Sequence, residues 1–221
     1  MPHPVLLLRD RKARHVIFVA PELTTIAAMI ARGDVSNVLP EAERLASLGS
    51  ASAKAFLAYA EMTGVFGNAP RYPRAELLAT ESAGSGNLFG HYVLGWVRLA
   101  QNRRGEAFQQ MFIAAERLFL PAVVDVGRFI TADIGVQKAD LSQSEKAFLQ
   151  AHRLGHRGAL VFLMKMYATG ACGWWRRLLA VVGYPYALAR RAIFARRMPF
   201  SEKVFAYSSS DVPKVVNAMR T

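Results

Sequence analysis

A pattern of small residues recurs four times along this chain, and it limits the possible folds more than any other feature. Each copy has a turn position, a small residue four places later and an apolar residue eight places later. The turn positions, spaced 37, 32 and 37 residues apart, are Gly49, Gly86, Leu118 and Gly155. The small residues four places later are Ala53, Gly90, Ala122 and Ala159. Repeats of this length are typical of stacked pairs of antiparallel helices. The spacing therefore predicts an all-α fold, an α-solenoid of about four units with capping helices at both ends.

A further position, nine places after each turn, also holds a small residue in most copies. Its residues are Ala58, Gly95, Gly127 and, in the fourth copy, Met164. The two positions lie five residues apart, or about 1.4 helical turns, and we expect them to share a face on which the helices of one pair approach closely. A packing role is predicted for ten small residues: Gly49, Ala53, Gly86, Gly90, Gly95, Ala122, Gly127, Gly155, Ala159 and Gly170.

Local residues predict where the helices begin and end. Pro73 and Pro121 fit the first turn of a helix, where the missing N–H is tolerated. Ser142 with Glu145 three residues later predicts a capping box. Gly64 fits the position just beyond the C-terminus of a helix, where glycine is favoured.

The register resembles the Sel1-like repeat, a relative of the tetratricopeptide repeat, over about residues 41–170. That pattern has alanines before a turn glycine, a small residue after it, then a Leu-Gly pair, a tyrosine and a closing glycine. The residues that fit it are Gly49, Ala53, Leu57, Gly64, Ala75, Ala83, Gly86, Leu94, Gly95, Ala107, Ala114, Ala115, Ala122, Gly127, Gly155, Ala159, Leu163, Tyr167 and Gly170.

The chain departs from that pattern in three ways, one of which is that the first helix lacks the family's aromatic pair. Leu118 stands where the third unit should have its turn glycine, and only the fourth unit keeps the tyrosine; the others have Glu61, Arg98 and Ile130. The resemblance implies a non-enzymatic adaptor or scaffold that binds other proteins. In bacteria such proteins often serve envelope, polysaccharide or signalling assemblies.

Charge divides the chain into three regions. The whole chain has a net charge of +12, yet residues 21–170 carry only +2 of it. Residues 171–221 hold nine basic and two acidic residues. We therefore expect an N-terminal cap over residues 1–40, a solenoid over 41–170 and basic, Trp- and Arg-rich helices over 171–221. A basic segment of this kind favours an anionic membrane surface, an acidic protein or a nucleic acid as its partner.

The C-terminal region has a distinctive order of residues. Two arginine pairs bracket residues 178–189, which are mostly apolar, and Pro185 within them should kink or restart the helix. Tryptophan and arginine both suit the surface of an anionic bilayer. Two interpretations stay open and can coexist: a cap over the last repeat, or contact with a membrane or an acidic partner. The contact residues would be Trp174, Trp175, Arg176, Arg177, Arg190, Arg191, Arg196 and Arg197.

The cellular location of the protein is predicted from its apolar segments and its cysteine content. Residues 5–8 and 16–20 are apolar and suit short strands or an N-terminal helix, but they are too short for a secretory signal. No apolar run reaches the roughly 20 residues that span a bilayer. One cysteine gives no internal disulfide. We expect a cytoplasmic protein, or one that is peripheral on the inner face of the membrane.

Candidate chemical groups are few. His152 and His156 are four residues apart, but a turn glycine separates them, so a metal site is not expected. Cys172 has arginines nearby that could lower its pKa, yet no histidine has the spacing of a catalytic partner. We therefore predict no catalytic, cofactor or metal site, and a non-enzymatic protein-binding adaptor. The alternatives are a peripheral membrane adaptor, a nucleic-acid-binding helical protein, which no motif supports, and a degenerate enzyme built on Cys172 and the histidines.

Overall fold

The computed structural model describes residues 36–64, 69–132, 140–156, 158–170 and 172–197, and also residues 23, 25, 26, 29 and 34. Within the last helix it describes side chains as far as Ala189. The expected features at residues 5–8 and 16–20 lie outside the described residues.

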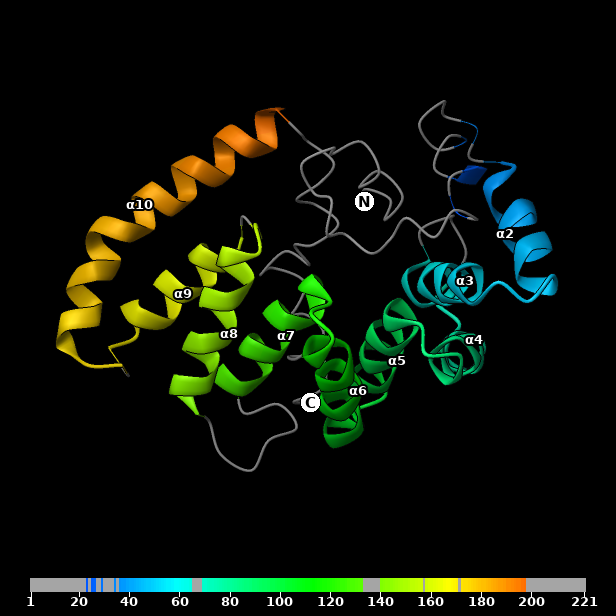
Figure 1. Cartoon of the computed structure of the whole chain (residues 1–221), viewed down its shortest axis with the longest axis horizontal. Helices are drawn as coiled ribbons and strands as arrows, with labels where there is room; N and C mark the ends of the chain where they lie inside the picture. The colour runs from blue at the N-terminus through cyan, green and yellow to red at the C-terminus, as the bar shows by residue number, and fades with distance from the viewer. Residues whose placement is uncertain are drawn as a thin grey trace.

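All regular elements in the described part of the chain are helices. They are α2 (Val38–Ser47), α3 (Ala51–Thr63), α4 (Tyr72–Gly84), α5 (Leu88–Ala100), α6 (Arg104–Glu116), α7 (Leu120–Thr131), α8 (Leu141–Arg153), α9 (Ala159–Ala168) and α10 (Trp174–Arg197). Each helix packs against the next, and they follow one another along an arc from α2 to α9, with α10 against α9 at the far end (Figure 1). The predicted all-α solenoid of antiparallel helix pairs is confirmed, with units α2–α3, α4–α5, α6–α7 and α8–α9.

The four turn positions share one backbone geometry. Their φ angles are all positive: +91° at Gly49, +77° at Gly86, +60° at Leu118 and +97° at Gly155. In each unit the following residue donates its N–H to the carbonyl five residues earlier, as Ser50 does to Leu45 at 3.1 Å and His156 to Ala151 at 2.9 Å. This is the hydrogen-bond pattern with which helices commonly end at a left-handed residue.

Leu118 adopts a left-handed conformation that glycine adopts without strain. Replacing it with glycine should raise the free energy of unfolding by about 0.5–1 kcal/mol, because relief of backbone strain exceeds the added chain entropy. Leu48 is the matched control: it is also an exposed leucine at such a turn, but its φ is −79°. Leu48→Gly should lower stability in urea denaturation, and equal effects of the two substitutions would contradict the strain argument.

The helix starts agree with the sequence in part. Pro73 and Pro121 lie in the first turns of α4 and α7, as predicted. The capping box at Ser142 is wrong, because α8 begins one residue before it. Asp140 caps this helix instead, and its carboxylate accepts the N–H groups of Ser142 and Gln143 at 2.9 and 3.1 Å. The N-cap of α8 is therefore Asp140, two residues before Ser142.

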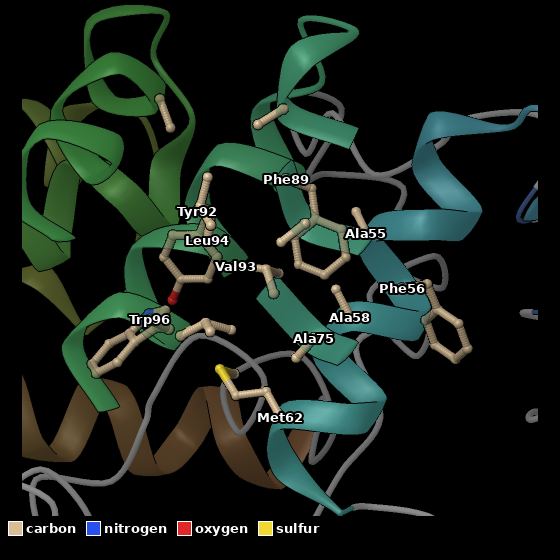
Figure 2. Packing of buried hydrophobic residues seen from close by; sticks show 14 of the residues in the cluster. Ala55, Phe56, Ala58, Met62, Ala75, Phe89, Tyr92, Val93, Leu94 and Trp96 are labelled. Atoms are coloured by element: carbon tan, nitrogen blue, oxygen red, sulfur yellow. The ribbon is translucent and has the colours of Figure 1, made fainter. Parts of the chain in front are cut away.

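The second helix of each unit supplies most of the core. In α5, nine of the thirteen residues are buried, whereas the buried residues of α4 are Ala75, Ala79, Ser82 and Ala83. Aromatic rings follow one another across these second helices: Tyr59 contacts Phe89, Phe89 and Tyr92 contact Phe119, and Trp96 contacts Phe129. Figure 2 shows Phe89, Tyr92 and Trp96 on α5, with Ala55 and Ala58 of α3 beside them.

The repeated small residues serve two different contacts. At the fourth position, a Cβ on Gly90 would lie 2.5 Å from Ser82 Oγ, so this position contacts the first helix of the same pair. At the ninth position, a Cβ on Gly95 would lie 2.8 Å from Met111 of α6, and one on Gly127 would lie 2.9 Å from Phe148 of α8. The expectation that both positions face the same pair is therefore wrong. Five residues turn a helix by about 500°, which leaves the two positions about 140° apart.

Helix α10 occupies the place that the first helix of a fifth unit would take. Met164 is the ninth-position residue of the fourth unit, and its Sδ lies 2.5 Å from where a Cβ on Gly183 would be. In the second and third units a glycine on the second helix, Gly95 or Gly127, receives a large side chain. Here the large side chain comes from the second helix and the glycine from α10. The last repeat is therefore covered by a helix that uses the same kind of contact.

Candidate interaction surfaces

The inner side of α10 is built from small residues. Ala180 and Ala187 are 3% and 2% exposed, and Gly183 lies between them against Met164. These residues recur at helical spacing, so they form one stripe along α10. The stripe lets α10 lie close to α9, and it leaves the large apolar side chains of α10 on its other faces.

The outer side of α10 is apolar and exposed. Trp174 is 69% exposed and Val182 is 78% exposed. From residue 174 to residue 189, where the description of side chains ends, the charged residues are Arg176 and Arg177. The exposed apolar side chains, called here the outer face of α10, are Trp174, Trp175, Leu178, Leu179, Val181, Val182, Tyr186 and Leu188. At 1.5 Å per residue this face is about 21 Å long, and an exposed apolar surface of that kind usually marks an interaction site.

The two tryptophans stand at the start of this face. Their rings stack with centroids 4.7 Å apart and an angle of 13° between the planes. Pro185, farther along, does not restart the helix, since α10 continues through it to Arg197. The predicted contact residues Trp174 and Trp175 therefore begin a single long apolar face.

Arg176 is directed toward the repeats. Its guanidinium lies 2.9 Å from Glu145 of α8 and over the ring of Tyr167 on α9. The hydroxyl of Tyr167 also donates to Glu145, and burial, together with this hydrogen bond, raises the pKa of Tyr167 to about 12. These contacts fix the first turn of α10 on the fourth unit.

The other predicted arginines are Arg177 and four residues near the end of α10. Arg177 is exposed, and its Cδ would lie 3.7 Å from a Cβ placed on Gly170. Arg190, Arg191, Arg196 and Arg197 belong to the last turns of α10, whose backbone alone is described. Their predicted contact with a membrane or acidic partner stays a prediction.

A cavity of about 250 Å³ opens between α7 and α9. Its lining is almost entirely apolar, and Phe148 of α8 contributes a wall. Two cationic side chains, Arg128 and Lys165, also line it. The main lining residues are Arg128, Phe129, Phe148, Phe162, Lys165 and Met166.

Arg128 is held in place by Asp125 of its own helix and by Phe162 of α9. Its guanidinium pairs with Asp125 at 2.6 Å and lies over the ring of Phe162 at 5.0 Å. Asp125 is buried and also accepts the hydroxyl of Tyr92 at 2.8 Å. Burial raises the pKa of Asp125, and Arg128 opposes that rise. This network links α5, α7 and α9.

The candidate chemical groups do not form a reactive centre among the described residues. Burial raises the pKa of Cys172, so the expected lowering by arginines is wrong; Arg176 lowers it by less than desolvation raises it. His152 and His156 lie on either side of the turn glycine, as the register predicted. No three His, Cys, Asp or Glu side chains of the described segments gather as a metal site needs.

One solved structure with a similar fold is the crystal structure of a Sel1 repeat protein from Oxalobacter formigenes. The TM-score is 0.58 at 20% sequence identity, over 71% of this chain and 64% of the other. The chain has a Sel1-like repeat fold. The match spans less than two thirds of the Oxalobacter protein. No family model matches the sequence, and no curated protein matches it.

The Sel1-like register also contains a feature that sequence reasoning missed. Ten places after each turn stand Tyr59, Trp96, Arg128 and Lys165. This position is aromatic in the first two units and cationic in the last two, and both cations line the cavity. The change was visible in the aligned copies, but only the structure shows that it lies at a cavity. For α10, the sequence predicted the apolar run but not which side of the helix would be exposed.

Proposed function

We propose that this protein is a non-enzymatic adaptor that binds other proteins through its helical repeats. The observation that carries the proposal is the regular stack of four helix pairs, since such stacks present extended surfaces that suit binding. The resemblance of the register to Sel1-like repeats supports the same function. On the basis of this resemblance, we extend the proposal to the kind of partner: a protein of a bacterial envelope, polysaccharide or signalling system.

Affinity capture from the native cell tests the adaptor function. The intact chain should retain one or a few proteins in a constant ratio to itself after washing with salt. The proposal would be contradicted by capture of no protein in constant ratio. It would also be contradicted by a catalytic turnover that co-purifies with the chain and disappears after a single substitution in the α7–α9 cavity.

We also propose that the outer face of α10 holds the adaptor on an anionic membrane surface, at the inner face of the membrane. Its exposed side chains are apolar over about 21 Å, and two of them are tryptophans, which favour the boundary between lipid and water. A helix of this kind lies in the plane of the surface. No helix in the described segments is long and apolar enough to cross a bilayer.

Charge favours a membrane over a second copy of the chain as the partner of this face. Residues 171–221 contain nine basic and two acidic residues. Two copies joined through α10 would bring two such positive segments together, whereas anionic lipid headgroups attract them. Nucleic acid is a weaker candidate, because the outer face of α10 is apolar and Arg176 is paired with Glu145.

Vesicle co-sedimentation should show this attachment. The intact chain should bind vesicles of phosphatidylcholine with phosphatidylglycerol more strongly than vesicles of phosphatidylcholine alone. Val182→Glu should reduce the bound fraction severalfold, because a charge then enters the centre of the apolar face. Leu77→Glu is the control, since Leu77 is an exposed leucine on α4, at 60%.

Two results would contradict the membrane proposal. The first is equal binding of the intact chain and of Val182→Glu to anionic vesicles. The second is that the chain does not bind vesicles but forms a dimer in analytical ultracentrifugation, in a concentration-dependent way that Val182→Glu abolishes. That result would assign the outer face of α10 to contact with a second copy of the chain.

A further inference from the structure

Helix α10 is fastened to the fourth unit in the way that α6 is fastened to the second. Glu76 of α4 stands ten residues before the turn position of its unit, and it pairs with Arg103 at the start of α6 at 2.5 Å. Glu145 of α8 stands at the same position of the fourth unit, and it pairs with Arg176 in the first turn of α10 at 2.9 Å. Since α6 is an internal helix of the stack, α10 is joined to the stack as an internal helix would be.

The packing contact of α10 also has the register of a first helix. Met111 of α6 and Phe148 of α8, which fill the space beside glycines of the preceding units, each lie seven residues before their own turn positions. Gly183, the corresponding contact residue of α10, lies seven residues before Arg190, and α10 continues through that position as one helix. Helix α10 therefore occupies a place of the repeat, rather than lying loosely against its end.

Leaving that place would give α10 little to offer a bilayer. As far as its side chains are described, the side of α10 that is buried against α9 consists of small residues, Ala180, Gly183 and Ala187. Their transfer to lipid would add little apolar surface to that of the outer face. Separation would also expose buried side chains of α9 and break the pair of Arg176 with Glu145. The docked helix therefore already presents most of the apolar surface that a bilayer could bind.

We propose that α10 enters the membrane surface while it stays docked on α9, so that the fourth unit is held against the bilayer and the other units extend away from it. The proposal rests on membrane attachment through the outer face of α10, and it adds the orientation of the adaptor. Figure 1 shows the other labelled helices on the side of α10 where α9 lies, which is opposite the outer face. The surfaces of the first three units then remain accessible to a soluble partner protein.

A reversible cross-link between α9 and α10 tests the docked state. The full chain carries Met164→Cys and Gly183→Cys, with Cys172→Ser to remove the native thiol. A Cβ on Gly183 would lie 3.5 Å from Met164 Cγ, whose place the thiol at position 164 takes, so a disulfide can form. The oxidised and reduced forms of this variant are matched controls for each other. They should bind vesicles of phosphatidylcholine with phosphatidylglycerol with affinities within about twofold. Binding of the oxidised form that is weaker by about fivefold or more would show that α10 must leave α9, and would overturn the proposal.

Hydrogen exchange on the unaltered chain gives a second measurement, which does not depend on the folding of a variant. If α10 stays docked, the amides of α9 (Ala159–Ala168) should keep or increase their protection when anionic vesicles are added. If α10 leaves the repeats, α9 loses its cover at the end of the stack, and its amides should exchange about tenfold faster or more. The second result would overturn the docked state.

Energy transfer to an acceptor-labelled lipid measures the orientation of the repeats. A donor is attached to Arg177→Cys at the start of α10, or to Leu77→Cys on α4, each with Cys172→Ser. Both positions are exposed. Transfer should be severalfold stronger from position 177, because the second unit extends away from the membrane. Equal transfer from the two positions would show that the repeats lie along the bilayer, and would contradict the proposed orientation.

These results separate failure of the orientation from failure of the membrane attachment. If the reduced cross-linking variant binds anionic vesicles and the oxidised form does not, the attachment stands and the docked state is lost. If the intact chain does not bind anionic vesicles, both proposals are lost.

Discussion

Replacing Gly90 with alanine is expected to lower the free energy of unfolding by about 3 kcal/mol, because the added methyl group overlaps buried atoms of α4. A Cβ there would lie 2.5 Å from Ser82 Oγ and 2.7 Å from the backbone nitrogen of Ala83. Ser82 is fully buried, and its hydroxyl donates to the carbonyl of Ala51 at 2.7 Å. Moving Ser82 aside would break this bond between α4 and the first unit. Urea denaturation followed by circular dichroism measures the loss.

Gly105→Ala makes the same chemical change with the opposite expected sign. Gly105 lies in α6, and a Cβ there would have no neighbouring atom within 4 Å. Alanine should therefore raise stability by about 0.5 kcal/mol through its higher helix propensity. If both substitutions destabilised the protein equally, close packing at the fourth position would not explain the repeat. Loss of stability at Gly90 alone would support it.

The repeat register could be predicted because each copy contains the same kind of turn. A left-handed residue favours glycine, so Gly49, Gly86 and Gly155 mark the turns in the sequence. The register was clear enough to place the third turn at Leu118, against its own conformational preference. What the register could not give was the direction of each small residue. Gly90 and Gly95 are both small, but one faces its own pair and the other faces the next unit.

The interaction surfaces could be predicted only in part, because they depend on contacts between residues that are distant in the sequence. The apolar run of α10 was visible, but Ala180, Gly183 and Ala187 decide which side faces the repeats. Arg176 was predicted as a contact for a membrane or acidic partner, and its pairing with Glu145 joins residues that are distant in the sequence. The cavity likewise requires three helices to be placed together. Local patterns predict helices and turns, whereas the contents of the space between units depend on which side chains meet there.

Asp125→Ala is expected to lower the free energy of unfolding by about 3–5 kcal/mol, because it leaves the mostly buried Arg128 without its partner. The substitution removes the 2.6 Å ion pair with Arg128 and the 2.8 Å hydrogen bond from Tyr92. The same substitution at Glu106 is the control, since Glu106 pairs with Arg103 at 2.6 Å but is half exposed. Glu106→Ala should leave the urea midpoint nearly unchanged, because water screens exposed ion pairs.

A double substitution separates loss of the pair from loss of packing. If the cost of Asp125→Ala comes from the unpaired charge, adding Arg128→Met should recover part of it, because the remaining group is apolar. Additive losses in the double variant would instead assign the cost to a cavity at Asp125. Because Arg128 also lines the α7–α9 cavity, the network that links the second helices of three units also fixes one wall of that cavity.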